Sequence, residues 1–167
     1  IRIANCSGFF GDRLSAAKEM VEGGPIDVLT GDWLAELTML ILARKRAKRP
    51  SGGYAQTFVK QMEQVMGTCL EKGIKVVSNA GGLDPDGCAD AVAAAAQKLG
   101  VHPTIAYVSG DDLLPTVADR IARRELMNFE TGEPITDASA YLTANAYLGC
   151  WGIVEALEQG ADIVITG

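Results

Sequence analysis

Histidine is almost missing from this sequence, which holds one residue of that type, His102. A zinc site built on several imidazoles is therefore excluded, and a Ser-His-Asp triad would depend on that one position. His102 precedes Pro103 at the start of an expected strand, on the edge of the sheet opposite to the polar loops described below. We therefore do not expect it to be catalytic.

Cysteine is scarce and scattered: Cys6, Cys69, Cys88 and Cys150 form no CxxC pair and no compact disulfide spacing. Such cysteines are typical of free thiols in a reducing compartment. The N-terminus opens on strand-like residues 1–4, with no basic region and apolar core of a secretory signal. These features predict a cytoplasmic protein.

Long hydrophobic runs are also missing. The richest apolar stretch, residues 34–43, is interrupted by Glu36 and Thr38, and roughly 18 continuous apolar residues are needed to cross a bilayer. We therefore expect no membrane interaction. The 167 residues, 48% hydrophobic and 22% charged, are typical of a folded protein with one core.

Positive charge is in deficit, with 15 Lys and Arg against 21 Asp and Glu and a formal net charge of -6. This balance disfavours binding to nucleic acid. One exception is the run at 44–49, where five of six residues are cationic. We interpret it as a solvated helix end that complements the helix dipole; a dock for a phosphate-bearing cofactor such as coenzyme A, or for an acidic partner, is the alternative.

Short apolar runs alternate with segments of helical period, which predicts an α/β fold: a three-layer sandwich with a mostly parallel sheet and helices on both faces. Expected strands are residues 1–4, 27–30, 75–78, 104–108, 141–143 and 162–166. Expected helices are 33–47, buried on more than one side, 54–70 and 86–99. An incomplete β/α barrel is the alternative fold.

We expect residues 1–167 to form a single α/β domain. The final segment, 161–167, reads as an apolar strand ending in a glycine, and such a strand normally leads into a loop and a helix. The chain is therefore expected to be the N-terminal part of a longer one.

Polar and small residues follow four of the expected strands, where ligands bind in parallel sheets. From these loops and from the segment 143–149 we select Asp32 and Asp111 as candidate proton-transfer residues. The candidate substrate-binding residues are Asn5, Ser7, Gly8, Asn79, Gly81, Gly82, Asp112 and Asn145. Asn5, Ser7, Asn79 and Asn145 would position substrate oxygens, and Gly81 and Gly82 would offer backbone N–H donors.

Each of these residues also has a purely structural explanation. Short turns after strands use Gly and Asn, and an aspartate before a helix caps it. Neither GxGxxG nor a P-loop occurs in these glycine-containing loops, so dinucleotide and ATP sites are unsupported. Magnesium or calcium is more plausible than zinc if Asp32, Asp111 and Asp112 converge, but capping accounts for these carboxylates individually, and we predict no metal site.

Five blocks in order resemble the acyclic terpene utilisation family, in its N-terminal region. They are NCSGFFGDR at 5–13, GGPIDVLTGDWLAELT at 23–38, SNAGGLDP at 78–85, SGDDLLP at 109–115 and TANAYLG at 143–149. The resemblance implies a link to bacterial breakdown of acyclic terpenoids such as citronellol and geraniol, by a route through coenzyme A thioesters. It transfers no catalytic residue.

Together, the family resemblance and the polar loops predict a catabolic enzyme, a lyase or hydratase, that acts on an acyl or acyl-coenzyme A intermediate by hydration, dehydration or carbon-carbon cleavage. The cofactor is unknown, and a coenzyme A thioester is considered as the substrate. The competing hypothesis is a non-catalytic binding or assembly subunit of a catabolic pathway. The expected partners are a small acyl molecule and a second copy of the chain in a homo-oligomer.

Overall fold

The structure is a computed structural model that describes residues 1–49 and 52–167. The elements in chain order are β1 (Ile3–Asn5), α1 (Ala16–Glu22), β2 (Val28–Gly31), α2 (Glu36–Lys48), α3 (Gln56–Lys72), β3 (Lys75–Ser78), α4 (Pro85–Leu99), β4 (Ile105–Tyr107), the 3₁₀ helix η2 (Leu114–Thr116), α5 (Val117–Ala122), the 3₁₀ helix η3 (Ala138–Ala140), α6 (Trp151–Glu158) and β5 (Ile163–Ile165).

The sheet has five parallel strands in the order β1-β2-β3-β5-β4. The predicted α/β fold with a mostly parallel sheet is confirmed. In a β/α barrel, consecutive strands lie side by side, whereas here β5 lies between β3 and β4. The observed strand order therefore favours the sandwich.

The chain divides into two compact units. Unit 1 comprises residues 1–109 and 149–167 and contains the sheet; unit 2 comprises residues 110–148. In unit 2, α5 follows η2 directly, and isolated bridges join Asp112 to Asn145 and Met127 to Pro134. The two units are described separately below.

One face of the sheet carries the core. Helices α1, α3 and α4 pack there, and Leu29, Val76 and Ile165 from the strands are buried with them. In α3 the buried residues are Phe58, Gln61, Met62, Val65, Met66 and Cys69, which follow the three- and four-residue steps of one helix face. Gly73 ends α3 in the left-handed conformation that favours glycine.

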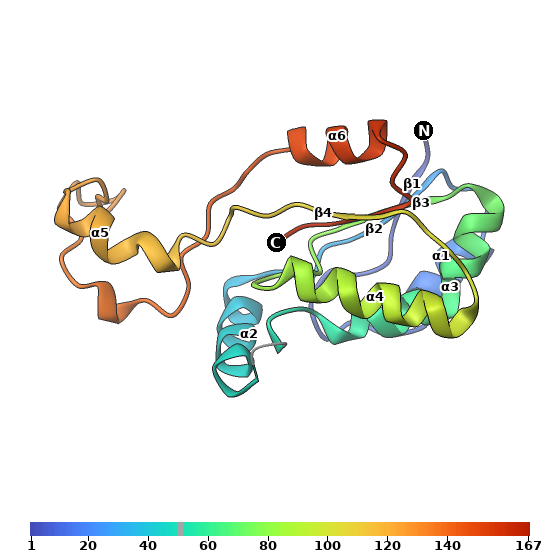
Figure 1. Cartoon of the computed structure of the whole chain (residues 1–167), viewed down its shortest axis with the longest axis horizontal. Helices are drawn as coiled ribbons and strands as arrows, with labels where there is room; N and C mark the ends of the chain where they lie inside the picture. The colour runs from blue at the N-terminus through green and yellow to red at the C-terminus, as the bar shows by residue number, and fades with distance from the viewer. Residues whose placement is uncertain (50–51) are drawn as a thin grey trace. The chain divides into compact units, whose positions relative to one another are not determined.

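The opposite face of the sheet is covered by α6. The connections from β1 to β2, from β2 to β3 and from β3 to β4 all lead in one direction across the sheet. The connection from β4 to β5 leads in the opposite direction. Crossover connections between parallel strands are right-handed. Two such connections that lead in opposite directions across a sheet therefore place their helices on opposite faces of it. Figure 1 shows this arrangement, with α6 on one side of the strands and α4 on the other.

Two expectations about local structure are wrong. Residues 141–143 form no strand: Tyr141 and Thr143 are residue types that favour a strand, but among the described residues no strand pairs with them. The helix expected at 33–47 begins at Glu36 and buries Thr38 and Leu42, while Leu37 is 68% exposed. It is therefore not buried on several sides.

Cys6, Cys69 and Cys88 are buried free thiols and Cys150 is an exposed one, so the chain has four unpaired cysteines, as the spacing predicts. Within the described ranges, none of the helices is both long and apolar enough to span a bilayer.

At the amino edge of the sheet, Asp162 joins three strands. Its Oδ1 accepts a hydrogen bond from Nζ of Lys75 on β3 at 2.8 Å, and its Oδ2 accepts one from the backbone N–H of Thr104, before β4, at 2.9 Å. The hydrogen bond from Lys75 is the largest of the effects that lower the pKa of Asp162. A carboxyl with a lowered pKa in the folded state stabilises that state above its ordinary pKa and loses this contribution as the pH falls.

We therefore expect Asp162→Asn to reduce the free energy of unfolding by about 1 kcal/mol at neutral pH. The difference from the parent protein should shrink below about pH 4, where the carboxylate becomes protonated. Urea unfolding at several pH values measures this, with exposed Asp90→Asn as the control. An equal loss of stability at all pH values would contradict this account.

Candidate functional site

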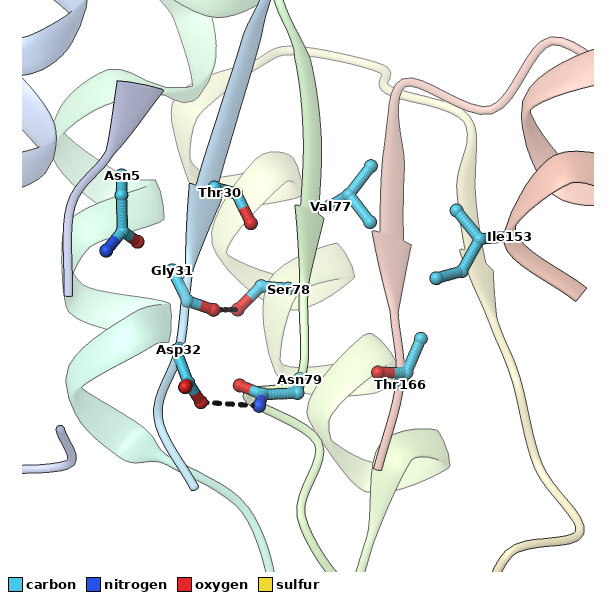
Figure 2. A pocket seen from close by; sticks show the side chains of 9 residues that line it. All are labelled: Asn5, Thr30, Gly31, Asp32, Val77, Ser78, Asn79, Ile153 and Thr166. Atoms are coloured by element: carbon cyan, nitrogen blue, oxygen red, sulfur yellow. Dashed lines mark hydrogen bonds between the residues drawn. The ribbon is translucent and has the colours of Figure 1, made fainter. Parts of the chain in front are cut away.

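A hollow of about 370 Å³ lies at the carboxyl ends of β2 and β3 in unit 1. It is lined by Asn5, Thr30, Gly31, Asp32, Val77, Ser78, Asn79, Ile153 and Thr166. Figure 2 shows these residues on β1, β2 and β3, the end of β5 and helix α6. Ligands of open parallel sheets bind at this edge, and the hollow is therefore the candidate site.

Strand alternation explains why polar side chains meet here. The sheet register pairs Asn5 with Thr30 and Thr30 with Val77, and partners in register point to the same face. Asp32 and Asn79 follow Thr30 and Val77 by two residues and so continue on that face. It is the face opposite to the core, which is why polar groups are accommodated there.

Asp32 and Asn79 hold the two strand ends together. The Nδ2 of Asn79 donates a hydrogen bond to Oδ1 of Asp32 at 2.8 Å, and Oδ1 of Asn79 accepts one from the backbone N–H of Trp33 at 2.8 Å. The backbone N–H of Leu34 also donates to Oδ1 of Asp32, at 3.3 Å. These bonds hold Asp32 in one orientation and engage its Oδ1, whereas its Oδ2 accepts no hydrogen bond from residues 1–49 and 52–167.

The other polar side chains of the hollow are less engaged. In the described part of the chain, the side chains of Asn5 and Thr30 make no hydrogen bond, and the Thr166 hydroxyl donates to the carbonyl of Gly167 at 3.1 Å. The amide of Asn5 and the hydroxyl of Thr30 are thus available as donors to a ligand.

Ser78 and Gly31 form the wall between the hollow and the core. The Ser78 hydroxyl is buried and donates to the Gly31 carbonyl at 3.0 Å. A Cβ at position 31 would lie 2.8 Å from the indole Nε1 of Trp33. Glycine is therefore required here so that the buried indole can pack against the strand.

Ser7 and Gly8 serve the loop after β1. Ser7 is buried and its hydroxyl donates to the carbonyl of Phe9, at 2.9 Å. The N–H groups of Gly8 and Arg13 donate to the carboxylate of Asp12, and the Gly8 bond is the first cause of its lowered pKa. Neither Ser7 nor Gly8 lines the hollow.

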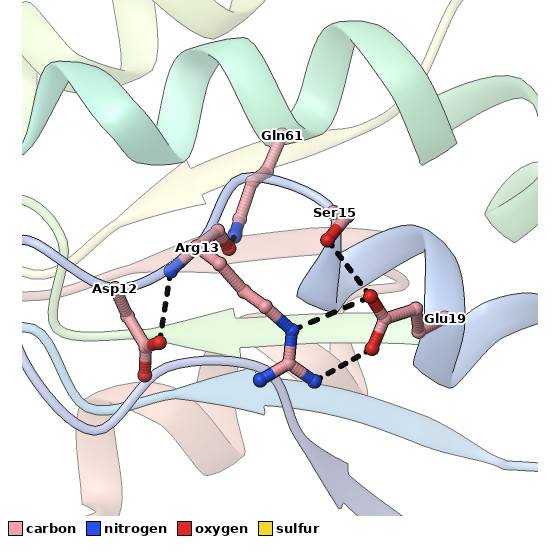
Figure 3. A network of polar contacts seen from close by, with 5 residues as sticks. All are labelled: Asp12, Arg13, Ser15, Glu19 and Gln61. Carbon is pink, nitrogen blue, oxygen red and sulfur yellow. Dashed lines mark hydrogen bonds and ion pairs between the residues drawn. The ribbon is translucent and has the colours of Figure 1, made fainter.

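Arg13 anchors the same loop to two helices, as Figure 3 shows. Its guanidinium contacts the Glu19 carboxylate at 2.6 Å, which lowers the pKa of Glu19, and Ser15 donates to that carboxylate as well. The buried amide of Gln61 on α3 donates to the Arg13 carbonyl at 3.2 Å. This network keeps the loop that follows Asn5 in place.

Gly81 and Gly82 let the loop after β3 pack closely against neighbouring parts of the chain. The Gly81 N–H donates to the Thr166 carbonyl, and the Gly82 N–H to the Asn79 carbonyl. Both predicted donors are thus already engaged within the chain. A Cβ on Gly81 would lie 2.5 Å from the Thr166 carbonyl oxygen. A Cβ on Gly82, which has φ +55°, would lie 2.5 Å from Cδ1 of Leu42.

Three further candidate residues meet in unit 2. The Asp111 side chain is buried, and its Oδ2 accepts a hydrogen bond from Nδ2 of Asn145 at 2.9 Å. Oδ1 of Asp112 accepts one from the backbone N–H of Leu114 at 3.0 Å. Sequence reasoning considered a site in which Asp32, Asp111 and Asp112 converge. In the structure Asp111 and Asp112 belong to unit 2, together with Asn145, whereas Asp32 belongs to unit 1.

The chemistry of the hollow is that of hydrogen-bonding oxygens and amides. Burial raises the pKa of the Cys6 thiol, beside the hollow in sequence, to about 11, so this cysteine is a packed thiol and not a nucleophile at neutral pH. Among the described residues, no group of three or more His, Cys, Asp or Glu is placed to hold a metal ion. Of the described residues that line the hollow, Asp32 alone carries a carboxylate.

Sequence reasoning missed Thr30, Thr166 and Ile153 as site residues. Thr30 could have been found, because it precedes Asp32 by two residues in a strand and must share its face. Thr166 lies beside Asn79 only because β5 pairs with β3, and no local sequence pattern predicts that pairing. Ile153 lines the hollow only because α6 lies on the face of the sheet opposite to the core, and the sequence does not show this position.

A family model described as acyclic terpene utilisation family protein AtuA matches residues 1–167. Comparisons with curated proteins and with solved structures found no match. The family match covers every residue of the candidate site.

The hydrogen bonds of Asn79 lead to a prediction. Asn79→Ala removes the acceptor of the Trp33 N–H and the donor to Asp32, and two lost bonds cost about 2 kcal/mol of unfolding free energy. Chemical denaturation measures the loss, and Gln64→Ala, an exposed position on α3, is the control. If Asn79→Ala matched the control in stability, the proposed link between the β2 and β3 ends would be wrong.

Proposed function

The chain belongs to the acyclic terpene utilisation protein AtuA family, and from this premise we propose that the hollow binds a small acyl compound, as the free compound or as its coenzyme A thioester. We propose further that the protein is a catabolic enzyme that uses Asp32 to transfer a proton. The observation that carries the proposal is the position of one oriented carboxylate among free hydrogen-bond donors in a hollow at the carboxyl edge.

Recognition of an acyl group needs donors for its carbonyl oxygen and apolar surface for its chain. The amide of Asn5 and the hydroxyl of Thr30 are available as donors, and Val77 and Ile153 give the hollow apolar surface. Asn79, fixed against Asp32, holds the carboxylate in one orientation. These features support binding of a polar carbonyl head with a short apolar tail.

Hydration, dehydration and cleavage of a carbon-carbon bond next to a carbonyl all require proton removal from carbon, from a hydroxyl or from water. In each case Oδ2 of Asp32 would accept the proton. Donation from Asn5 and Thr30 to the carbonyl oxygen would stabilise the negative charge that develops on it. A later step returns the proton, so the carboxylate is regenerated.

Asp111 remains the second candidate for proton transfer. Its buried carboxylate accepts a hydrogen bond from Asn145 in unit 2, which equally supports a role in holding that unit together. Asp111→Asn separates the two roles. Loss of turnover with unchanged stability supports proton transfer, and loss of stability with turnover retained per folded molecule supports the structural role.

The central test is Asp32→Asn. This substitution preserves the side-chain shape and removes the proton acceptor, so turnover of a reactive acyl-coenzyme A thioester should fall by at least about 100-fold while binding persists. Mass spectrometry over a panel of such thioesters measures turnover, and exposed Asp90→Asn is the matched control. If no member of the panel is bound or converted by the parent protein, the proposal is wrong.

A non-catalytic binding or assembly subunit is the competing function. The observation that favours it is that Oδ1 of Asp32 already accepts two hydrogen bonds from the chain itself, as a structural aspartate would. Under this function Asp32→Asn leaves growth on the relevant carbon source intact, whereas under the enzymatic function growth is lost.

A further inference from the structure

Unit 2 contains a hydrogen-bonded turn, residues 127–134, which we call the Phe129 turn. The side chain of Asn128 accepts hydrogen bonds from the N–H groups of Glu130 and Thr131, and the Asn128 N–H donates to the Glu133 carbonyl. A bridge between Met127 and Pro134 closes the turn. The turn is therefore fixed by its own hydrogen bonds.

The Phe129 turn presents an unusual surface. The side chain of Phe129 is 102% exposed and that of Met127 is 50% exposed, and both Glu130 and Glu133 are exposed beside them. Aromatic side chains are frequent anchors of protein interfaces, and a turn whose backbone is already fixed loses little backbone entropy when it binds. The turn thus offers an apolar anchor flanked by two negative charges.

Helix α2 in unit 1 carries the complementary surface, which we call the α2 outer face: Leu37, Ile41, Arg44 and Lys48. These residues follow steps of four, three and four and so lie on one side of the helix. Leu37 is 68% exposed, Ile41 is partly exposed, and Arg44 and Lys48 are exposed. The first half of this face is apolar and the second half is cationic.

We propose that the protein forms a reciprocal homodimer, in which the Phe129 turn of each copy docks on the α2 outer face of the other. Phe129 packs on Leu37 and Ile41, and the two glutamates of the turn pair with Arg44 and Lys48. This interface goes beyond the proposed function and does not involve the hollow.

The distribution of charged residues along the chain favours a second copy of the chain as the partner. The chain has a net charge of -6, so two copies repel each other unless a basic surface meets an acidic one. Residues 44–49 carry five of the chain's 15 cations, whereas residues 110–148 carry seven acidic against three basic residues. Because each copy presents both surfaces, two copies related by a twofold axis satisfy both at once.

A charge exchange tests the interface. Variant A carries Arg44→Glu and Lys48→Glu, and variant B carries Glu130→Lys and Glu133→Lys. In homodimers of either variant, like charges face each other at both contacts, so the dimer dissociation constant should rise by at least about tenfold. In an equimolar mixture of A and B, opposite charges meet at both contacts and a heterodimer should form.

Analytical ultracentrifugation measures the association, and circular dichroism checks that each variant is folded. Lys60→Glu with Lys98→Glu, two exposed positions on α3 and α4, makes the same change in charge away from the interface and should leave the dimer intact. Phe129→Ser, which removes the anchor and no charge, should also weaken the dimer.

The outcomes are decisive in both directions. A dimeric parent protein, monomeric A and B, and a restored dimer in their mixture support the proposal. A parent protein that is monomeric at every concentration overturns it, as does a species that keeps growing with concentration. Variants that dimerise as the parent does, or a mixture that stays monomeric, overturn it equally.

Discussion

The change of direction between β4 and β5 is the constraint on which the arrangement of unit 1 depends. Three connections progress across the sheet, and α1, α3 and α4 fill one face with the core. The fourth connection returns and brings α6 to the other face. Within the described residues of unit 1, that face is therefore covered by one short helix beside β5, and side chains at the ends of β1, β2 and β3 can be polar there. The hollow is a consequence of this uneven coverage.

Within the hollow, the hydrogen-bonded pair of Asp32 and Asn79 has both a structural and a chemical consequence. The pair links the ends of two neighbouring strands, satisfies the backbone N–H of buried Trp33, and orients the carboxylate. One interaction thus stabilises the fold and presents an oriented carboxylate. Asp12 shows the contrasting case, in which both carboxylate oxygens accept backbone N–H groups and the side chain only braces a loop.

Local sequence pattern predicted most of the sheet and α3, because short apolar runs mark the strands and three- and four-residue steps of apolar residues mark α3. It also predicted Asn5, Asp32 and Asn79 as residues of one site, since parallel strands end at a common edge. The strand expected at 141–143 was wrong because strand formation needs a partner, which composition does not reveal. Thr166 and Ile153 could not be found because the insertion of β5 between β3 and β4 is a long-range event. The exposed face of α2 could not be predicted either, because the sequence of an apolar helix does not show whether another surface covers it.

The most direct test of the central claim is a titration of the ¹⁵N-labelled protein with an unreactive acyl-coenzyme A analogue, followed by amide chemical shifts. The account predicts that the largest shifts occur at Asn5, Thr30, Asp32, Asn79 and Thr166, which line the hollow. Binding that shifts amides elsewhere in the chain and leaves these five unchanged would contradict the assignment of the hollow as the substrate site.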